Sequence, residues 1–316
     1  MLEAGRMRIV MPVVGTIAIL ISAPGCGPGA GKDTAAVRLR VTRDFGAVAV
    51  TETAVTKVPA SETAMRLLAR EAQLKTRYGG GFVQCVKDLC GGRRGGRNYD
   101  WFYFVNGVEA PKGAAATRVR ANDSIWWDLR DWSVAERVPA VVGQFPEPFR
   151  HGPGVPGRLP TRIECADVKD AACGAVRQAL GREDVGDGVA PLRATAAGES
   201  LRIIVGTWEQ IGAERALVVL EDGPAASGIY ARPQDRGRAI ALLDPAGRTV
   251  RTLGPGGGLV AATRVGEDPP VWVVTGTDAA GVLAAARALE PQVLRRRYAV
   301  AVDSGGPVGL PLEAAR

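Results

Sequence analysis

The first part of the chain alternates between apolar and polar positions in a way that predicts short strands around one helix. Apolar residues occupy every second position of VRLRVTR, at Val37, Leu39 and Val41, which is typical of a half-buried strand. A second alternating run, VAVTETAVTKV, follows. From Ser61 an apolar stripe at helical spacing predicts a helix that ends at the glycine run 79–81.

The segment after this helix predicts further strands joined by tight turns. FVQCVKDLC is typical of a short strand that enters a turn, and DWFYFVNG predicts a strand that ends at the pair Asn106–Gly107. Asn-Gly between apolar runs is the strongest short hairpin signal. TRVRANDSIWWDL adds two strand pieces around the turn RANDS. Residues 36–138 are therefore expected to form one small domain.

Prolines and glycines become frequent between residues 139 and 161, which predicts a hinge before a second domain at 162–316. Strand and helix patterns alternate in this second part, and that order is typical of an α/β layered domain. The expected strands are TRIECA, SLRIIVGTW, ALVVLED, GIYAR, AIALLD, LVAATR, PVWVVTG and YAVAVD. The expected helices are DAACGAVRQALGRE and DAAGVLAAARALEPQVLRR, the second capped by Thr277 or Asp278.

The first 25 residues have the features of an export signal. Arg6 and Arg8 precede the apolar run Ile9 to Ala23, which is shorter than the roughly 20 residues of a membrane-spanning helix. Cys26 follows at once, an arrangement that resembles a bacterial lipobox and implies a lipid on Cys26 with residues 26–35 as a tether. A cleaved secretory signal and an uncleaved anchor are the alternatives. The expected location is the outer face of the cell membrane.

The remaining cysteines agree with an exported protein. The chain has five cysteines, and with Cys26 lipidated the other four form the close pairs Cys85/Cys90 and Cys165/Cys173. An oxidising compartment favours two local disulfides. A catalytic or metal-bound thiol pair is the alternative reading of the same spacing.

The aromatic strand and the acidic turn of the first domain resemble the transcobalamin C-terminal-like family, a domain of unknown function also found in bacterial surface proteins. The resemblance covers about residues 36–133 and implies a compact α+β, β-grasp-like fold. In the vitamin carriers such a domain is a lid over cobalamin, but the α-barrel half of those carriers has no counterpart here. The resemblance rests on Trp101, Tyr103, Val105, Asn106, Gly107, Asp123, Ile125 and Trp127.

Strand alternation divides the aromatic residues between two faces of the sheet. The family motif has Trp101, Tyr103 and Trp127 at recurrent positions, so the resemblance implies that these three form the core set under the helix. The other face is expected to be open, and an apolar patch there would mark an interaction site. The residues predicted to face a ligand are Tyr99, Phe102, Phe104 and Trp126. The alternative is that loops or the second domain cover this face.

The sequence offers no catalytic set, so we do not expect an enzyme. The single histidine, His151, lies in the hinge, and zinc sites usually need several His or Cys ligands. Asp128 and Asp131 could act as paired carboxylates but are expected to be solvated. No metal or cofactor is expected.

The chain has a net charge of +7, which favours anionic partners such as lipid headgroups or wall polymers. Nucleic acid is not expected, because the basic residues are scattered and GGRRGGR has the pattern of an exposed loop.

The leading functional hypothesis is a lipid-anchored protein that captures a small ligand, with a corrinoid as the candidate, through the aromatic sheet face. A surface adhesive module that binds protein or wall polymer is the first alternative. A hydrolase-associated carbohydrate module is the second.

Overall fold

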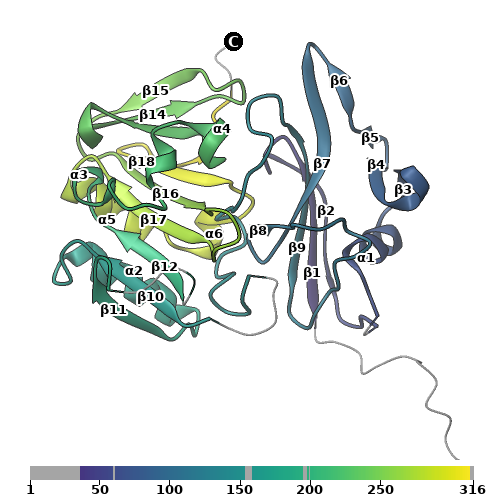
Figure 1. The fold of residues 1–316 in the computed structure, drawn as a ribbon, viewed down its shortest axis with the longest axis horizontal. Coiled ribbons are helices and arrows are strands. Elements are labelled where there is room, and N and C mark those ends of the chain that lie inside the picture. The colour runs from purple at the N-terminus through teal and green to yellow at the C-terminus, as the bar shows by residue number, and fades with distance from the viewer. Residues whose placement is uncertain (1–35, 60, 154–158, 195–197, 199, 314–316) are drawn as a thin grey trace, which may run out of the picture.

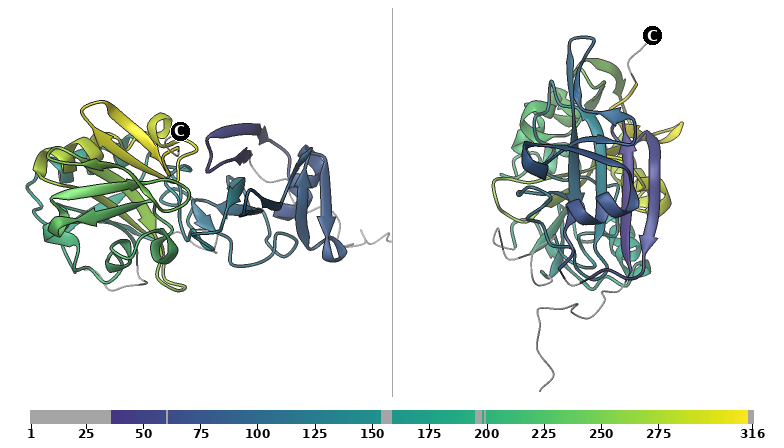
Figure 2. Two further views of the ribbon diagram at one scale, coloured as in Figure 1. Left: turned by 90° about the horizontal axis from the view of Figure 1, so that it is seen from above. Right: turned by 90° about the vertical axis from the view of Figure 1, so that its right-hand side faces the viewer.

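Two domains lie side by side in the computed structural model, which describes residues 36–59, 61–153, 159–194, 198 and 200–313. The first domain is purple to blue at the right of Figure 1, and the second is teal-green to yellow at the left. The view from above also shows the two domains next to each other (Figure 2). The mixed α+β class expected from the sequence is confirmed.

The first domain is a mixed sheet with one helix. The sheet order is β2-β1-β9-β7-β6, with β8 paired to β7. The central pair β1/β9 is parallel and its neighbours are antiparallel. A separate small sheet holds β3, β4 and β5. The elements are β1 (Val37–Arg43), β2 (Val48–Val55), α1 (Ala64–Glu71), β3 (Leu74–Arg77), η1 (Tyr78–Gly80), β4 (Phe82–Val86), β5 (Leu89–Cys90), β6 (Gly92–Arg94), β7 (Arg97–Val105), β8 (Val108–Glu109) and β9 (Ser124–Asp131).

Helix α1 is shorter than its apolar stripe predicts. It begins after Thr63, whose side chain accepts the N–H of Arg66, and it ends at Glu71. The expected start at Ser61 and end at the glycine run are therefore wrong. The residues after it form β3, where Leu74 pairs with Val86 of β4. Strand pairing thus overrides the weak helix preference of this segment.

The two aromatic strands pair as their patterns predict. β7 and β9 are antiparallel neighbours, with Tyr103 opposite Trp127. The turn at Asn106–Gly107 joins β7 to β8, and both residues have positive φ, 51° and 82°, as a two-residue hairpin turn requires.

The second domain is built on one seven-stranded sheet, in the order β11-β10-β12-β17-β16-β18-β19. Helices α2 and α5 cover one face, and the small antiparallel sheet β13-β14-β15 lies against the other. Its strands are β10 (Thr161–Cys165), β11 (Asp187–Pro191), β12 (Leu201–Val205), β13 (Ala231–Gln234), β14 (Ala239–Leu243), β15 (Thr249–Leu253), β16 (Gly258–Thr263), β17 (Val271–Gly276), β18 (Ala299–Asp303) and β19 (Gly306–Leu310). Its helices are α2 (Ala171–Arg182), α3 (Trp208–Ile211), η2 (Val218–Leu220), α4 (Pro224–Ser227), η3 (Asp235–Gly237), α5 (Ala279–Arg287) and α6 (Pro291–Leu294).

Two expected elements of the second domain are corrected. ALVVLED, expected as a strand, contains η2, because Leu217 and Leu220 are buried at helical spacing while Val218 is exposed. A short apolar run does not distinguish the two forms by itself. The last expected helix is divided into α5 and α6, since Pro291 begins a new helix. Asp278 does cap α5, through the N–H of Gly281.

The proline-rich connector is packed rather than extended into solvent. Val141, Val142 and Phe149 have no exposed area. Val141 N–H donates to Gly107 of the first domain, and Val142 N–H donates to Tyr298 of the second. The connector therefore fixes the two domains against each other. In the part of the chain that the structure describes, no helix is long and apolar enough to cross a membrane.

Candidate functional site

A hollow lies between the two domains, beside the connector. This interdomain cleft has a volume of about 410 Å³. One wall is formed by the β7–β8 hairpin and the loop that follows it, from Val105 to Arg120. The opposite wall is the loop between β16 and β17, from Arg264 to Pro270. Small ligands commonly bind at domain interfaces in pockets of roughly 300–1,000 Å³.

The surface of the cleft is largely aliphatic, with charges around it. Val105 and Val108 are buried and Leu159 is half-buried. Four prolines, whose rings restrict the backbone, add to the apolar surface. They are Pro111, Pro153, Pro269 and Pro270.

The acids of the cleft already have partners, whereas two of its bases form no ion pair among the described residues. The Glu109 carboxylate accepts the N–H of Val138 at 2.7 Å. Burial raises the pKa of Glu109, although the positive charge of Arg130 lowers it in part. Glu267 pairs with Arg264 at 3.2 Å within its own loop. Lys112 and Arg118 are exposed on the other wall and give the cleft an excess of positive charge.

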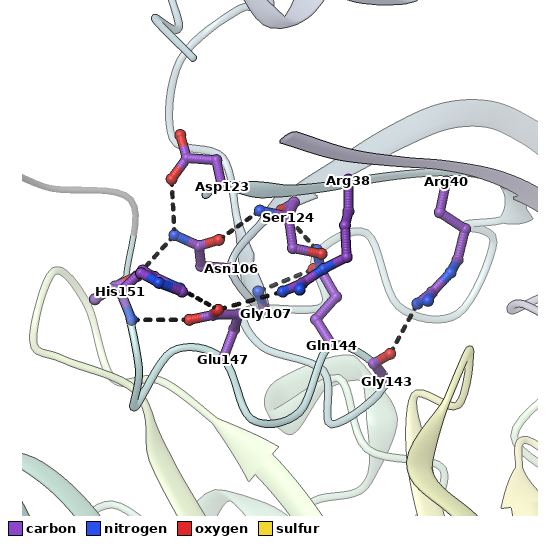
Figure 3. Close-up of polar contacts among 11 residues, drawn as sticks. Arg38, Arg40, Asn106, Gly107, Asp123, Ser124, Gly143, Gln144, Glu147 and His151 are labelled. Carbon is purple, nitrogen blue, oxygen red and sulfur yellow. Dashed lines mark hydrogen bonds and ion pairs between the residues drawn. The ribbon is translucent and has the colours of Figure 1, made fainter. Parts of the chain in front are cut away.

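A buried polar network holds the turn beside the cleft in place (Figure 3). The Asn106 amide nitrogen donates to Asp123 and to the carbonyl oxygen of Gly152, both at 3.0 Å. Its amide oxygen accepts the N–H of Ser124 at 2.8 Å. Asn106 has no exposed area, so each polar atom of its side chain is paired, as burial requires. Gly152 directly precedes Pro153, which lines the cleft. The network therefore fixes one edge of the cleft.

Gln144 of the connector completes this network. Its amide oxygen accepts the N–H of Gly107, and its amide nitrogen donates to Ser124. Figure 3 shows Gln144 reaching from the connector toward the β7–β8 turn. The residues on which the family resemblance rests, Asn106 and Gly107 among them, thus have a structural role here.

His151 forms a second polar contact in the connector. Its Nδ1 lies 2.6 Å from the carboxylate of Glu147, which has no exposed area. Arg38 of β1 reaches the same carboxylate at 3.4 Å. The one histidine of the chain is therefore paired within the connector, to the same carboxylate that Arg38 joins to the first domain (Figure 3).

The open sheet face predicted for the first domain is not open, which is a correction. Phe104 and Trp126 have no exposed area. Their rings pack against Tyr298 of the second domain, with centroids 5.6 and 5.4 Å from it. Two of the four predicted ligand-facing residues are therefore part of a core shared by both domains, and the alternative reading holds for them.

The other two predicted residues, Tyr99 and Phe102, are half-buried on β7. The Phe102 ring lies 3.7 Å from the guanidinium carbon of the buried Arg130. Tyr99 lies under Arg94 at 5.2 Å. Neither residue lines the interdomain cleft. Phe102 does line a smaller groove of about 220 Å³ beside Trp101 and Tyr103.

The core residues of the aromatic cluster lie where the family resemblance implies. Trp101, Tyr103 and Trp127 are all less than a tenth exposed and belong to the core under α1. Tyr103 and Trp127 stack with centroids 4.6 Å apart.

Asp128 and Asp131 are buried, contrary to the expected solvated pair. Strand alternation puts them on opposite faces of β9, so they do not form a carboxylate pair. Asp128 accepts hydrogen bonds from Thr42, Gly46 and Tyr298. Burial raises its pKa to about 6, although these donors lower it.

Both expected disulfides are present. Cys85–Cys90 joins β4 to β5, and Cys165–Cys173 joins β10 to α2. Cys26, the predicted lipidation site, lies outside the described residues. Within those residues no group of His, Cys, Asp and Glu side chains is arranged to hold a metal ion.

The comparison with known families agrees with the fold of the first domain. Residues 61–131 match a domain of unknown function (DUF4430). This is the transcobalamin-like C-terminal family of bacterial proteins. The matched region runs from just before α1 to the end of β9, so it contains the hairpin wall of the cleft. No curated protein matches the chain.

Sequence reasoning missed the cleft because its walls are distant in the chain. Lys112 and Arg118 lie in a loop of alanines, and Arg264 lies more than a hundred residues later. No spacing rule connects them. The sequence contains only an indirect signal. Lys112 and Arg118 lie in one short loop, and Pro269 and Pro270 lie in another.

Proposed function

We propose that the protein binds a small organic anion with an apolar body in the interdomain cleft. The observation that carries the proposal is the pair Lys112 and Arg118, which lie without ion-pair partners among the described residues beside an aliphatic pocket. Glu109 and Glu267, the acids nearby, are already satisfied. A carboxylate or phosphate on the ligand would pair with the two bases while its apolar part fills the pocket.

The rigid walls of the cleft support binding at modest cost in entropy. The hairpin wall is fixed by Asn106 and Gln144, and the connector is packed between the domains. The Arg264 guanidinium donates to carbonyl oxygens of Glu267 and Asp268 in its own loop. A preformed site loses less freedom on binding than a flexible one.

Binding rather than catalysis is the activity that we propose. No His, Cys or Ser lines the cleft in the described part of the chain. The Thr117 hydroxyl is within 2.8 Å of the Tyr103 hydroxyl. These contacts favour a site that holds a molecule over one that transforms it.

A corrinoid is the first ligand to test, because the family match is to a transcobalamin-like domain. A whole corrinoid is larger than the cleft and would occupy it only in part. Absorbance of the purified protein distinguishes this ligand from colourless anions.

We further propose that the protein is exported and anchored by lipid at Cys26. The two disulfides support an oxidising compartment. Replacing Cys26 with Ser is expected to move the protein from the membrane fraction to the soluble fraction. An intact mass that shows a free Cys26 thiol would reject the anchor.

The binding proposal is tested by thermal shift of the full chain in detergent against corrinoids, aliphatic carboxylates and phosphate esters. A ligand at about 100 times its Kd adds about 2.7 kcal/mol, which raises Tm by roughly 4 °C for a chain of this size. The double variant Lys112→Ala/Arg118→Ala should lose the shift. The matched control Arg232→Ala/Arg238→Ala removes two exposed arginines elsewhere and should keep it. Equal shifts in both variants would contradict the cleft as the site.

A further inference from the structure

The segment GGRRGGR forms a projecting hairpin rather than a loop. β6 and the start of β7 pair antiparallel, with Arg94 opposite Arg97. Gly95 and Gly96 form the turn with φ of 54° and 81°, which suits glycine. The hairpin extends past the rest of the first domain at the top of Figure 1.

The side chains of this hairpin are basic and exposed. Arg93 and Arg94 are both exposed, and Arg93 forms no ion pair in the described ranges. Arg94 lies over the Tyr99 ring, which is half-buried, at 5.2 Å. Arg97 differs, because it pairs with Asp131 at 3.2 Å. Two arginines are thus presented to solvent on a rigid strand pair.

The neighbouring β3–β4 turn adds a third cation and an aromatic pair. Arg77 is exposed and close enough to Asp100 of β7 to lower the pKa of that carboxyl, which burial raises. The next residue, Tyr78, is 85% exposed, and its ring meets that of Phe82 edge-on at 6.2 Å. These are the exposed aromatic residues of the described chain. We call Arg77, Tyr78, Phe82, Arg93 and Arg94 the basic–aromatic surface.

The hairpin of this surface lies at the opposite end of the sheet from the start of the first strand. Arg38 is in register with Ser124, which lies beside the Asn106 end of β7. The Gly95–Gly96 turn is at the other end of β7, nine residues away along the strand, or about 30 Å. Phe82 lies farther along the sheet, in a groove beside Trp101 and Tyr103. If the chain before Val37 leads to the membrane, which rests on the anchor proposed above, Arg93 and Arg94 lie at the end of the sheet away from it.

We propose that the basic–aromatic surface binds an anionic polysaccharide of the cell envelope. The arginines would pair with carboxylate or phosphate groups of the polymer, and Arg is suited to both. The exposed rings would pack against the apolar faces of its sugar rings, a contact that charged lipid headgroups do not offer. This site is separate from the interdomain cleft and does not depend on the ligand held there.

The test measures binding of the full chain in detergent to alginate, a polyuronate, with uncharged dextran as reference. Arg93→Glu/Arg94→Glu is compared with Arg232→Glu/Arg238→Glu, which makes the same change in net charge at two exposed positions of the β13–β14 hairpin. Tyr78→Ala, at an exposed site, tests the aromatic part. Vesicles of phosphatidylglycerol and a DNA duplex are the competing polyanions.

Alginate binding should weaken at least about tenfold in the first double variant and several-fold in Tyr78→Ala, and it should be unchanged in the control. It should also fall as salt rises to roughly 0.3 M. Equal losses in both double variants would mean that net charge alone is responsible, and the proposal would fail. Tighter binding to vesicles or DNA than to alginate, or no alginate binding at low salt, would overturn it as well. Loss of cleft binding in Lys112→Ala/Arg118→Ala leaves this outcome unaffected.

Discussion

Replacing Asp128 with Asn should remove a large part of the pH dependence of stability. Asp128 is fully buried where the domains meet, and it accepts hydrogen bonds from Thr42, Gly46 and Tyr298. The amide oxygen of the substituted side chain would retain the first two bonds. Its nitrogen would donate to the Tyr298 hydroxyl oxygen, which can accept as well as donate. The variant therefore keeps the contacts and loses only the ionisation.

The sign and size of the effect follow from the raised pKa of Asp128. In the folded protein this carboxyl titrates near pH 6, whereas its ordinary value is 3.8. Between these values the folded state holds a proton that the unfolded chain has released, so the free energy of unfolding falls as pH rises. The loss from this group approaches about 3 kcal/mol by pH 7. The Asp128→Asn variant has no such loss, so between pH 4 and pH 7 it should gain about 2.5 kcal/mol on the wild type, since part of the loss is already present at pH 4.

Urea unfolding followed by tryptophan fluorescence at several pH values between 4 and 8 measures this difference. Asp88→Asn, at an exposed turn, is the matched control and should track the wild type at every pH. A difference between Asp128→Asn and wild type that stays constant from pH 4 to pH 7 would refute the reasoning, because it would mean that the buried carboxyl does not titrate in this range.

Two other predictions concern the first domain. Trp127→Ala should lower the free energy of unfolding by about 3–5 kcal/mol, because Trp127 is 2% exposed and stacks on Tyr103. Phe102→Ala, at a half-buried site, should lower the free energy of unfolding clearly less in the same urea titration. Asn106→Ala should cost about 2–3 kcal/mol, since it leaves the Gly152 carbonyl and the Ser124 N–H without their partner; an unfolding midpoint equal to that of the wild type would show that water replaces the amide.

The local patterns of the chain were sufficient for most elements but not for what covers them. Alternation divided the aromatic residues between two faces, the family motif implied that Trp101, Tyr103 and Trp127 are the core set, and the structure agrees. The same alternation gave β7 and β9 apolar residues on the second face as well, at Phe104 and Trp126. Apolar residues on both faces are typical of strands buried on both sides. That signal pointed to a covering domain rather than to a platform.

The connector shows the same limit. Its prolines predicted a break in regular structure, and the connector does lack helix and strand between Val141 and Phe149. Its apolar residues, however, are spaced among the prolines and are buried. Gly143 lies so close to the second domain that a Cβ atom there would come within 2.7 Å of the Arg297 nitrogen. Such contacts depend on the partner surface, which local sequence does not encode.

The shared core has a consequence for how the cleft works. Opening the domains would expose the rings of Phe104, Trp126 and Tyr298, each worth roughly 1.5–3 kcal/mol or more when buried. It would also break the hydrogen bond between Asp128 and Tyr298. Motion about the connector is therefore expensive compared with the few kcal/mol that a small ligand could supply. The cleft is better described as a preformed pocket between two fixed walls, and for the anion that we propose, selectivity would come from the position of Lys112 and Arg118 and from the volume left beside them.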